Sequence, residues 1–181
     1  MTIAQSDLQW WRGERARGVA LYALLGALSG SLAATVVADS RVGDWIPWVW
    51  PGLIFGLVIA TALLRRRLAG PWRWGGFVAA STASHYAAVW LAIEVLHPLL
   101  DENMVLVGMV AGLAGSGFLT VASALMFRFV RRVFPILALL FAGTVLGALL
   151  GVGGEFWGAL ALYAGWQAGY AASLGVALPA R

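Results

Sequence analysis

Six apolar runs, each about as long as a membrane-spanning helix, constrain the fold more than any other feature of the sequence. They cover residues 19–38, 49–64, 74–97, 104–127, 134–150 and 157–178. A helix needs about 20 mainly apolar residues to cross the hydrocarbon core of a bilayer. The connections between the runs are short. The sequence therefore predicts an all-α, polytopic membrane bundle of six transmembrane helices, with residues 19–181 as a single domain.

The composition favours the same class of protein. Hydrophobic residues make up 61% of the chain and charged residues 11%, which leaves too little polar surface to cover a soluble core. The chain has no cysteine, so it offers no disulfide, thiolate metal site or catalytic thiol. Its net charge of +4 comes from arginines placed at the ends of the apolar runs. We therefore expect no nucleic-acid partner.

The arginines predict the orientation of the bundle. Eleven of the twelve precede the first run, lie between the second and third, follow the fourth or end the chain. Only Arg41 lies on the other side of the membrane. The acidic residues collect there with it (Asp39, Asp44, Asp101, Glu102 and Glu155). The positive-inside rule then places both termini in the cytoplasm of a bacterial-type inner membrane.

Residues 1–18 form a polar N-terminal segment before the first run. Trp10 and Trp11 stand beside arginines there, a pattern typical of an amphipathic segment at the cytoplasmic interface. A basic start before an apolar run is also how a signal peptide begins, and residues 38–40 match a cleavage site loosely. The run that follows has the length of a full span, which favours a retained helix.

A polar patch lies in the middle of the third run, at residues 81–86. Polar groups at this depth are costly and normally face a bundle interior, a cavity or a partner. The imidazole of His85 can relay protons, bind a ligand, or simply hydrogen-bond a neighbouring helix. We expect a ligand site near the membrane midplane that uses residues of the third and sixth runs: His85, Tyr86, Ser81, Ser84, Trp166, Gln167 and Tyr170.

Glu94 and His97 are the one candidate pair of metal ligands. They are three residues apart, the Glu-x-x-His spacing of helical di-metal proteins, which however need that motif twice. A divalent metal held with the nearby acidic residues is one interpretation of the pair, and solvated groups at a helix end are the other. No other cofactor is predicted.

Small residues at four-residue spacing predict close helix packing, because they allow two helix backbones to approach. The glycines that we expect at such contacts are Gly26, Gly30, Gly108, Gly112 and Gly115.

A shift of 84 to 85 residues aligns the two halves of the chain. Pro51 falls on Pro135, and Tyr86 falls on Tyr170. In the first and fourth runs, Leu28, Gly30, Ser31, Thr35 and Val36 fall on Leu113, Gly115, Ser116, Thr120 and Val121. With three spans per half, this pattern predicts two inverted three-helix repeats, as in many transporters. Chance similarity between helices rich in small residues is the alternative.

Three functions fit these features. The first is a transporter, channel or membrane-embedded substrate-binding subunit with a midplane site. The second is an accessory or structural subunit of a larger membrane complex. The third is a membrane enzyme acting on a lipid substrate through Glu94 and His97. In each case the expected partners are membrane lipids and either further copies of the chain or other membrane subunits.

Overall fold

The computed structural model describes residues 3–38, 46–100, 103–151 and 155–179, and all of the regular secondary structure within them is helical. The six long helices are α1 (Ile3–Ala38), α2 (Ile46–Arg65), α3 (Pro71–Trp90), α5 (Met104–Met126), α6 (Val133–Gly147) and α7 (Glu155–Ala177). Four short segments join or extend them: the π-helix η1 (Leu91–Leu96), α4 (His97–Leu99), and the 3₁₀ helices η2 (Arg128–Arg131) and η3 (Ala148–Gly151).

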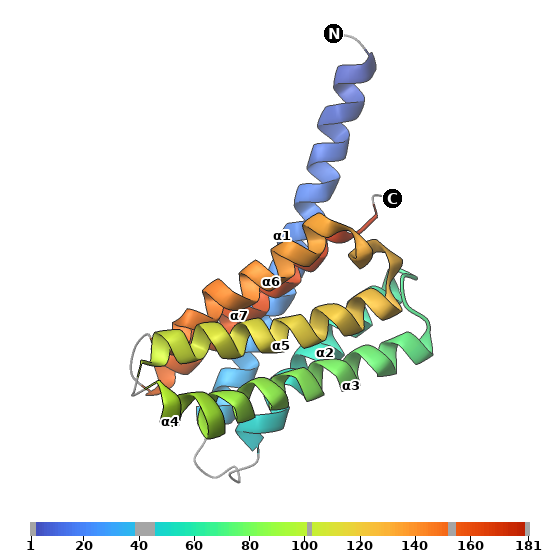
Figure 1. Cartoon of the computed structure of the whole chain (residues 1–181). Helices are drawn as coiled ribbons and strands as arrows, with labels where there is room; N and C mark the ends of the chain where they lie inside the picture. Colours follow the sequence, from blue (N-terminus) through green and yellow to red (C-terminus); the bar gives the residue numbers. More distant parts are fainter. Residues whose placement is uncertain (1–2, 39–45, 101–102, 152–154, 180–181) are drawn as a thin grey trace.

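The long helices form one bundle, in which each packs against its neighbours in the chain and α7 closes onto α1 (Figure 1). The all-helical bundle predicted from the sequence is confirmed. In the described part of the chain, five of the long helices are long and apolar enough to span a membrane. The sixth, α7, has 23 residues and buries the side chain of Gln167 inside the bundle. These properties are compatible with a polytopic membrane protein.

Helix α1 continues without a break through Gly18, where the sequence predicts the boundary between an N-terminal segment and the bundle. Its N-terminal part extends away from the other helices (Figure 1). The described part of that segment is therefore continuous with the first apolar run. Its location at a membrane interface stays a prediction.

Glycines bring helix backbones together where α1 meets α7 and where α5 meets α6. In α1, a methyl group on Gly26 or Gly30 would collide with the backbone carbonyl of Gln167 or Tyr163 in α7. In α5, a methyl group on Gly108 or Gly112 would collide with backbone carbonyls of α6. Such backbone-to-backbone contact is open only to glycine.

The remaining glycine that the sequence singles out, Gly115, lies where α5 meets α3. A methyl group there would stand 2.8 Å from Cβ of Ala88. All five predicted packing glycines thus lie at contacts inside the bundle. These glycines therefore pack the helices of this chain against one another.

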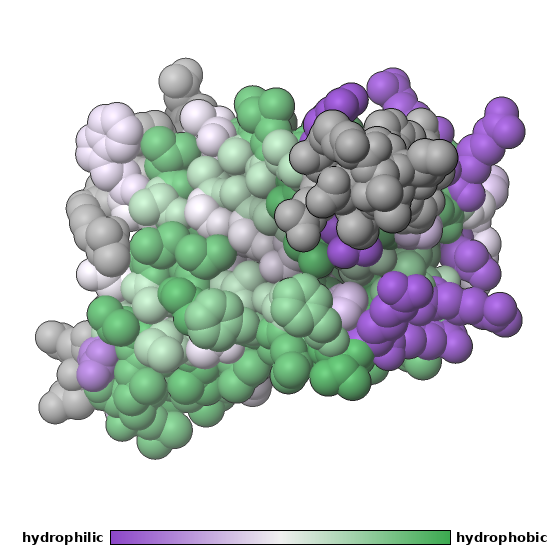
Figure 2. All heavy atoms as spheres, turned by 90° about the horizontal axis from the view of Figure 1, so that it is seen from above, coloured by the Kyte–Doolittle hydropathy of each residue, from purple (hydrophilic) through white to green (hydrophobic). Residues whose placement is uncertain are grey.

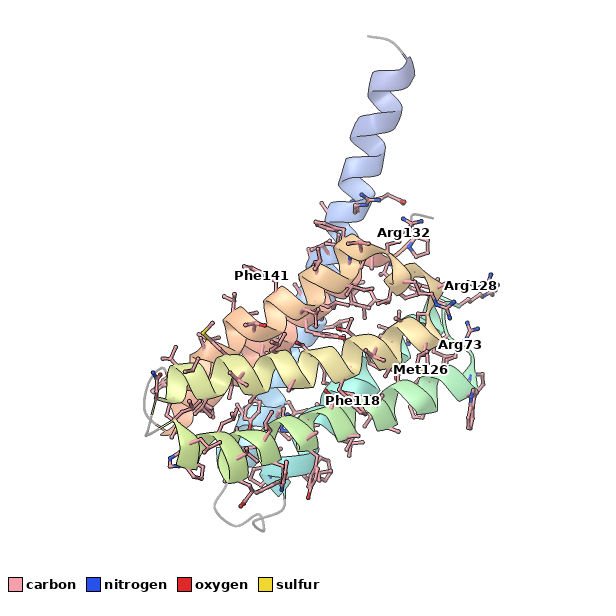
Figure 3. The ribbon with its side chains drawn as sticks, in the orientation of Figure 1. Arg73, Phe118, Met126, Arg128, Arg132 and Phe141 are labelled. Atoms are coloured by element: carbon pink, nitrogen blue, oxygen red, sulfur yellow. The ribbon has the colours of Figure 1, made fainter. Side chains whose placement is uncertain are left out.

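An arginine-rich end distinguishes one side of the bundle from the other. Arg73, Arg128 and Arg132 lie together at that end, whereas Phe118 and Phe141 lie along the outer sides of α5 and α6 (Figure 3). Figure 2 shows the same division: hydrophilic side chains gather at one end of the face, and most of the remainder is apolar. These arginines thus lie at one end of the bundle, and the orientation of the bundle in a membrane stays a prediction.

Arg67 ends helix α2 in a left-handed conformation, with φ of 59°. The N–H of Leu68 donates to the carbonyl of Leu63 at 3.0 Å, and the N–H of Arg67 donates to the carbonyl of Leu64 at 2.9 Å. This is the Schellman arrangement, in which glycine normally occupies the left-handed position.

We expect Arg67→Gly to raise the free energy of unfolding by about 1 kcal/mol, because glycine has no Cβ to strain in this conformation. Arg65→Gly is the matched control. Arg65 is exposed and helical, so glycine there should cost up to about 1 kcal/mol. Denaturant unfolding in detergent measures both variants. Equal destabilisation by the two would contradict the assignment of strain to Arg67.

Candidate functional site

His85 is held by a backbone carbonyl that a proline leaves without its usual partner. Pro51 has no N–H, so the carbonyl of Pro47, one turn earlier in α2, receives no helical hydrogen bond from it. Nε2 of His85 lies 3.0 Å from that carbonyl oxygen. A carbonyl can only accept, so Nε2 carries the proton, and in the neutral ring Nδ1 is the acceptor. No described residue donates to Nδ1.

The position of His85 depends on the close contact of α2 and α3. Gly52 lies directly against α3, since a methyl group on it would stand 2.6 Å from Cβ of His85. Ser81 fixes this contact by donating its hydroxyl to the carbonyl of Gly52 at 2.7 Å. On its other side, the His85 ring meets the ring of Tyr163 in α7, with centroids 5.8 Å apart.

Gln167 forms a second polar contact, between α7, α1 and α2. Its Oε1 accepts from the hydroxyl of Ser29 at 2.6 Å, and its Nε2 donates to the carbonyl of Pro51 at 3.1 Å. The Gln167 side chain is buried, and both of its polar atoms have partners. The amide therefore joins three helices.

A cavity of about 230 Å³ lies beside His85, in the half of the bundle away from the arginine-rich end. It is lined mainly by apolar side chains and small residues: Pro47, Trp48, Ser84, His85, Ala88, Val89, Ala92, Ile93, Gly108, Ala111, Gly112, Gly115, Gly147, Leu150, Leu162, Tyr163 and Trp166. Ile93 and Leu150 are also exposed on the outer surface of the bundle. The cavity thus joins the interior of the bundle to its apolar flank.

The π-helix η1 forms part of the cavity wall through Ala92 and Ile93. Here the N–H of His97 donates to the carbonyl of Ala92, five residues earlier. This spacing widens the turn and is found often at functional sites. No residue type in the segment indicates a π-helical turn, and we did not predict this turn from the sequence.

The structure brings together three of the seven residues predicted to bind a ligand. His85, Ser84 and Trp166 line the cavity. The other four do not: Ser81 and Gln167 make the helix contacts described above, Tyr170 is buried with its hydroxyl 3.3 Å from that of Thr120, and Tyr86 is exposed against Trp48. Their roles as ligand-binding residues stay predictions.

Tyr86 differs from His85 because one residue along a helix turns the side chain by about 100°. Its ring lies on the outer face, with a centroid 5.7 Å from that of Trp48.

Sequence reasoning missed Pro47 and Tyr163, which contact the imidazole of His85. The Pro47 contact had a signal, because a proline four residues later leaves a carbonyl in need of a donor.

Glu94 and His97, the candidate metal ligands, are both exposed. Among the described residues, no group of three histidine, aspartate or glutamate side chains could hold a metal ion. The wide turn of η1 also carries Glu94 away from the helical face that an α-helix would share with His97. The proposed acidic partners Asp101, Glu102 and Glu155 lie outside the described side chains.

The residues matched by the internal repeat share their surroundings only in part. Thr120 and Tyr170 are buried and lie within hydrogen-bond reach of one another, whereas their counterparts Thr35 and Tyr86 are exposed. Pro51 and Pro135 are both buried, and so are Gly30 and Gly115. The inverted repeat stays a prediction from the sequence.

The fold and the cavity define a class: an all-helical bundle with apolar helices of membrane-spanning length around a mostly apolar internal cavity. Comparison of the chain with protein-family models, with curated proteins and with solved structures gave no match. The functional argument therefore rests on the geometry of this chain.

Proposed function

We propose that the chain is a small integral membrane protein that binds a small, mostly apolar molecule in the cavity beside His85, as a transporter, channel or substrate-binding subunit does. The observation that carries the proposal is the cavity itself, with one imidazole in an otherwise largely apolar wall. A cavity of about 150 Å³ lined by apolar side chains is enough to bind benzene. The space here, about 230 Å³, suits a molecule of one ring or a short chain.

The chemistry of the wall indicates what such a molecule carries. Nδ1 of His85 is an acceptor without a described partner, so it favours a ligand with one hydroxyl or N–H donor. The remaining wall supplies apolar contact. The exposed residues Ile93 and Leu150 at the margin provide a route from the lipid phase. A ligand of this type partitions into a membrane before it binds.

The arginines support a bacterial-type inner membrane with both termini in the cytoplasm. The arginine-rich end then faces the cytoplasm, and the cavity lies in the outer half of the membrane. We also propose that the protein works among membrane lipids as an oligomer or with other membrane subunits.

Val89→Trp tests the proposal by filling the cavity, since Val89 lines it. Val121→Trp is the matched control, because Val121 is exposed on α5 and does not line the cavity. Native mass spectrometry of gently extracted protein should show a small bound molecule on the natural chain and on Val121→Trp. Val89→Trp should lose it.

Two results would contradict this proposal. Val89→Trp and Val121→Trp could keep the bound molecule equally, which would place it elsewhere. The natural chain could also carry no small molecule and travel in fixed ratio with other membrane subunits, which would favour an accessory role.

One observation favours that accessory role as a second candidate. Ala79, Ala83 and Ala87 follow one another at four-residue spacing on α3, and all three are exposed. Gly75 begins the same row, and a methyl group on it would meet no atom within 4 Å. In a membrane this row would suit close packing by a helix of another subunit. Ala83→Leu should then release that subunit without disturbing the fold of this chain.

A further inference from the structure

A second hollow, of about 200 Å³, lies at the arginine-rich end between α1, α7 and the end of α2. Arg15, Arg17 and Arg66 line it together with Glu14. Three positive charges against one negative charge leave the hollow with a net charge of +2. Guanidinium groups bind phosphate oxygens through paired, charge-assisted hydrogen bonds. The hollow therefore has the chemistry of a phosphate site.

Arg66 is held in place at this hollow. Its guanidinium carbon lies 5.9 Å from the centroid of the Tyr22 ring, an arrangement that attracts a cation to an aromatic face. Tyr22 is fully buried and belongs to the main hydrophobic core. Arg66 itself is only partly exposed. One arginine of the hollow is thus anchored by the core, while Arg15 and Arg17 are exposed at its rim.

Small residues make the floor of the hollow. Gly18 and Gly175 both line it, and a methyl group on Gly175 would stand 3.0 Å from Cα of Val19. Helices α1 and α7 are therefore in backbone contact beneath the arginines. Gly18 leaves the space above that contact open, because the nearest atom to a methyl group on it would be a guanidinium nitrogen of Arg66, 4.0 Å away.

An apolar stripe on α1 begins at the hollow. Leu21 lines the hollow and is exposed, and exposed leucines continue from it at three- and four-residue spacing: Leu24, Leu28 and Leu32. Residues at this spacing share one face of a helix. From Leu21 to Leu32 the stripe extends about 16 Å along the helix. That is about one leaflet of a hydrocarbon core about 30 Å thick.

We infer that this hollow binds the phosphate group of an anionic phospholipid, with an acyl chain of that lipid along the leucine stripe. The arginines recognise the head group, and the stripe distinguishes a lipid from a free phosphate ion. The arginine-rich end faces the cytoplasm in the proposed topology, so the lipid belongs to the inner leaflet. The inference requires the membrane location of the chain but not the cavity at His85.

The test titrates purified full-length protein in detergent with phosphatidylglycerol, with phosphatidylcholine of the same acyl chains, and with inorganic phosphate. Native mass spectrometry counts what is bound. We expect phosphatidylglycerol to bind more tightly than phosphatidylcholine, and Arg66→Gln to weaken it about tenfold. Arg15→Gln should weaken it about fivefold without touching the Tyr22 contact. Glu14→Gln should tighten it, because the one opposing charge is removed.

Two control variants make the result specific. Arg128→Gln removes the same charge at the same end of the bundle, outside the hollow, and should change affinity by less than about twofold. Leu24→Gln alters the stripe and should weaken the lipid while leaving the binding of inorganic phosphate unchanged.

Three outcomes would overturn the inference. Equal affinity for the two lipids would remove the role of the head-group charge. An equal effect of Arg128→Gln and Arg66→Gln would mean a diffuse surface potential instead of a site. Displacement of the lipid by inorganic phosphate at similar concentration would assign the hollow to a free anion.

Discussion

Replacing Gly112 with alanine should destabilise the bundle by about 1–3 kcal/mol, the usual cost of forcing an extra group into a packed interface. A methyl group there would collide with the backbone carbonyl of Gly143 and stand 3.1 Å from Cα of Gly147. Backbone atoms cannot rotate out of the way as the end of a side chain can. Helices α5 and α6 must therefore move apart, and every contact along their interface weakens.

Gly117→Ala, five residues further along α5, is the matched control. A methyl group on Gly117 would stand 3.8 Å from Cδ2 of Leu140, an ordinary van der Waals contact. Both substitutions gain helix propensity, by up to about 1 kcal/mol. Only the space around the new methyl group differs, so Gly117→Ala should be neutral or stabilising.

Thermal or denaturant unfolding in detergent gives the comparison. If Gly112→Ala were as stable as Gly117→Ala, the close contact of α5 and α6 would be wrong. Gly112 also lines the cavity. Loss of the cavity ligand in Gly112→Ala would therefore not by itself test the packing of α5 against α6.

The sequence predicted the bundle because apolar length is a property that each helix carries by itself. The expectation that Gly26 and Gly30 would pack closely also came from local spacing. The partner of a glycine is not local. Nothing in the sequence indicates that Gly30 contacts the carbonyl of Tyr163. Nor does it indicate that Gly108 and Gly112 in α5 pack against Gly143 and Gly147 in α6.

The candidate site was predictable only in part for the same reason. A histidine in an apolar run signals a buried contact, and His85 is indeed held inside the bundle. Its neighbours depend on how α3 is rotated, which placed Tyr86 on the outer face and Ser84 on the cavity. The π-helical turn that shapes the cavity wall is defined by its backbone hydrogen bonds and not by its side chains. Such a turn leaves no residue pattern to read.

His85→Ala should lower the free energy of unfolding by about 2 kcal/mol, and Pro51→Ala should remove part of that loss. Without the imidazole, the Pro47 carbonyl has neither a side-chain donor nor a helical one. A polar group left unsatisfied inside a protein costs about 1–3 kcal/mol. With alanine at position 51, the chain regains an N–H one turn after that carbonyl. The helix can then supply the missing hydrogen bond itself.

A double-mutant cycle measures this dependence. His85→Ala should cost about 1 kcal/mol less in the Pro51→Ala background than in the natural chain. Equal costs in the two backgrounds would show that His85 stabilises the bundle by packing alone. His85→Gln is a useful companion, because its amide can still donate to Pro47 while presenting a different outline to the cavity.

The same variants distinguish the roles of the two nitrogens of the His85 ring. Nε2 holds α3 to α2, whereas Nδ1 is the acceptor proposed to meet a ligand. The double variant restores the backbone hydrogen bond but not the ring. If it regains stability and still carries no bound molecule, the imidazole has a binding role beyond its structural one. If the double variant regains both stability and the bound molecule, the wall of the cavity suffices for binding. His85 then serves only to donate a hydrogen bond to the Pro47 carbonyl in place of the N–H that Pro51 lacks.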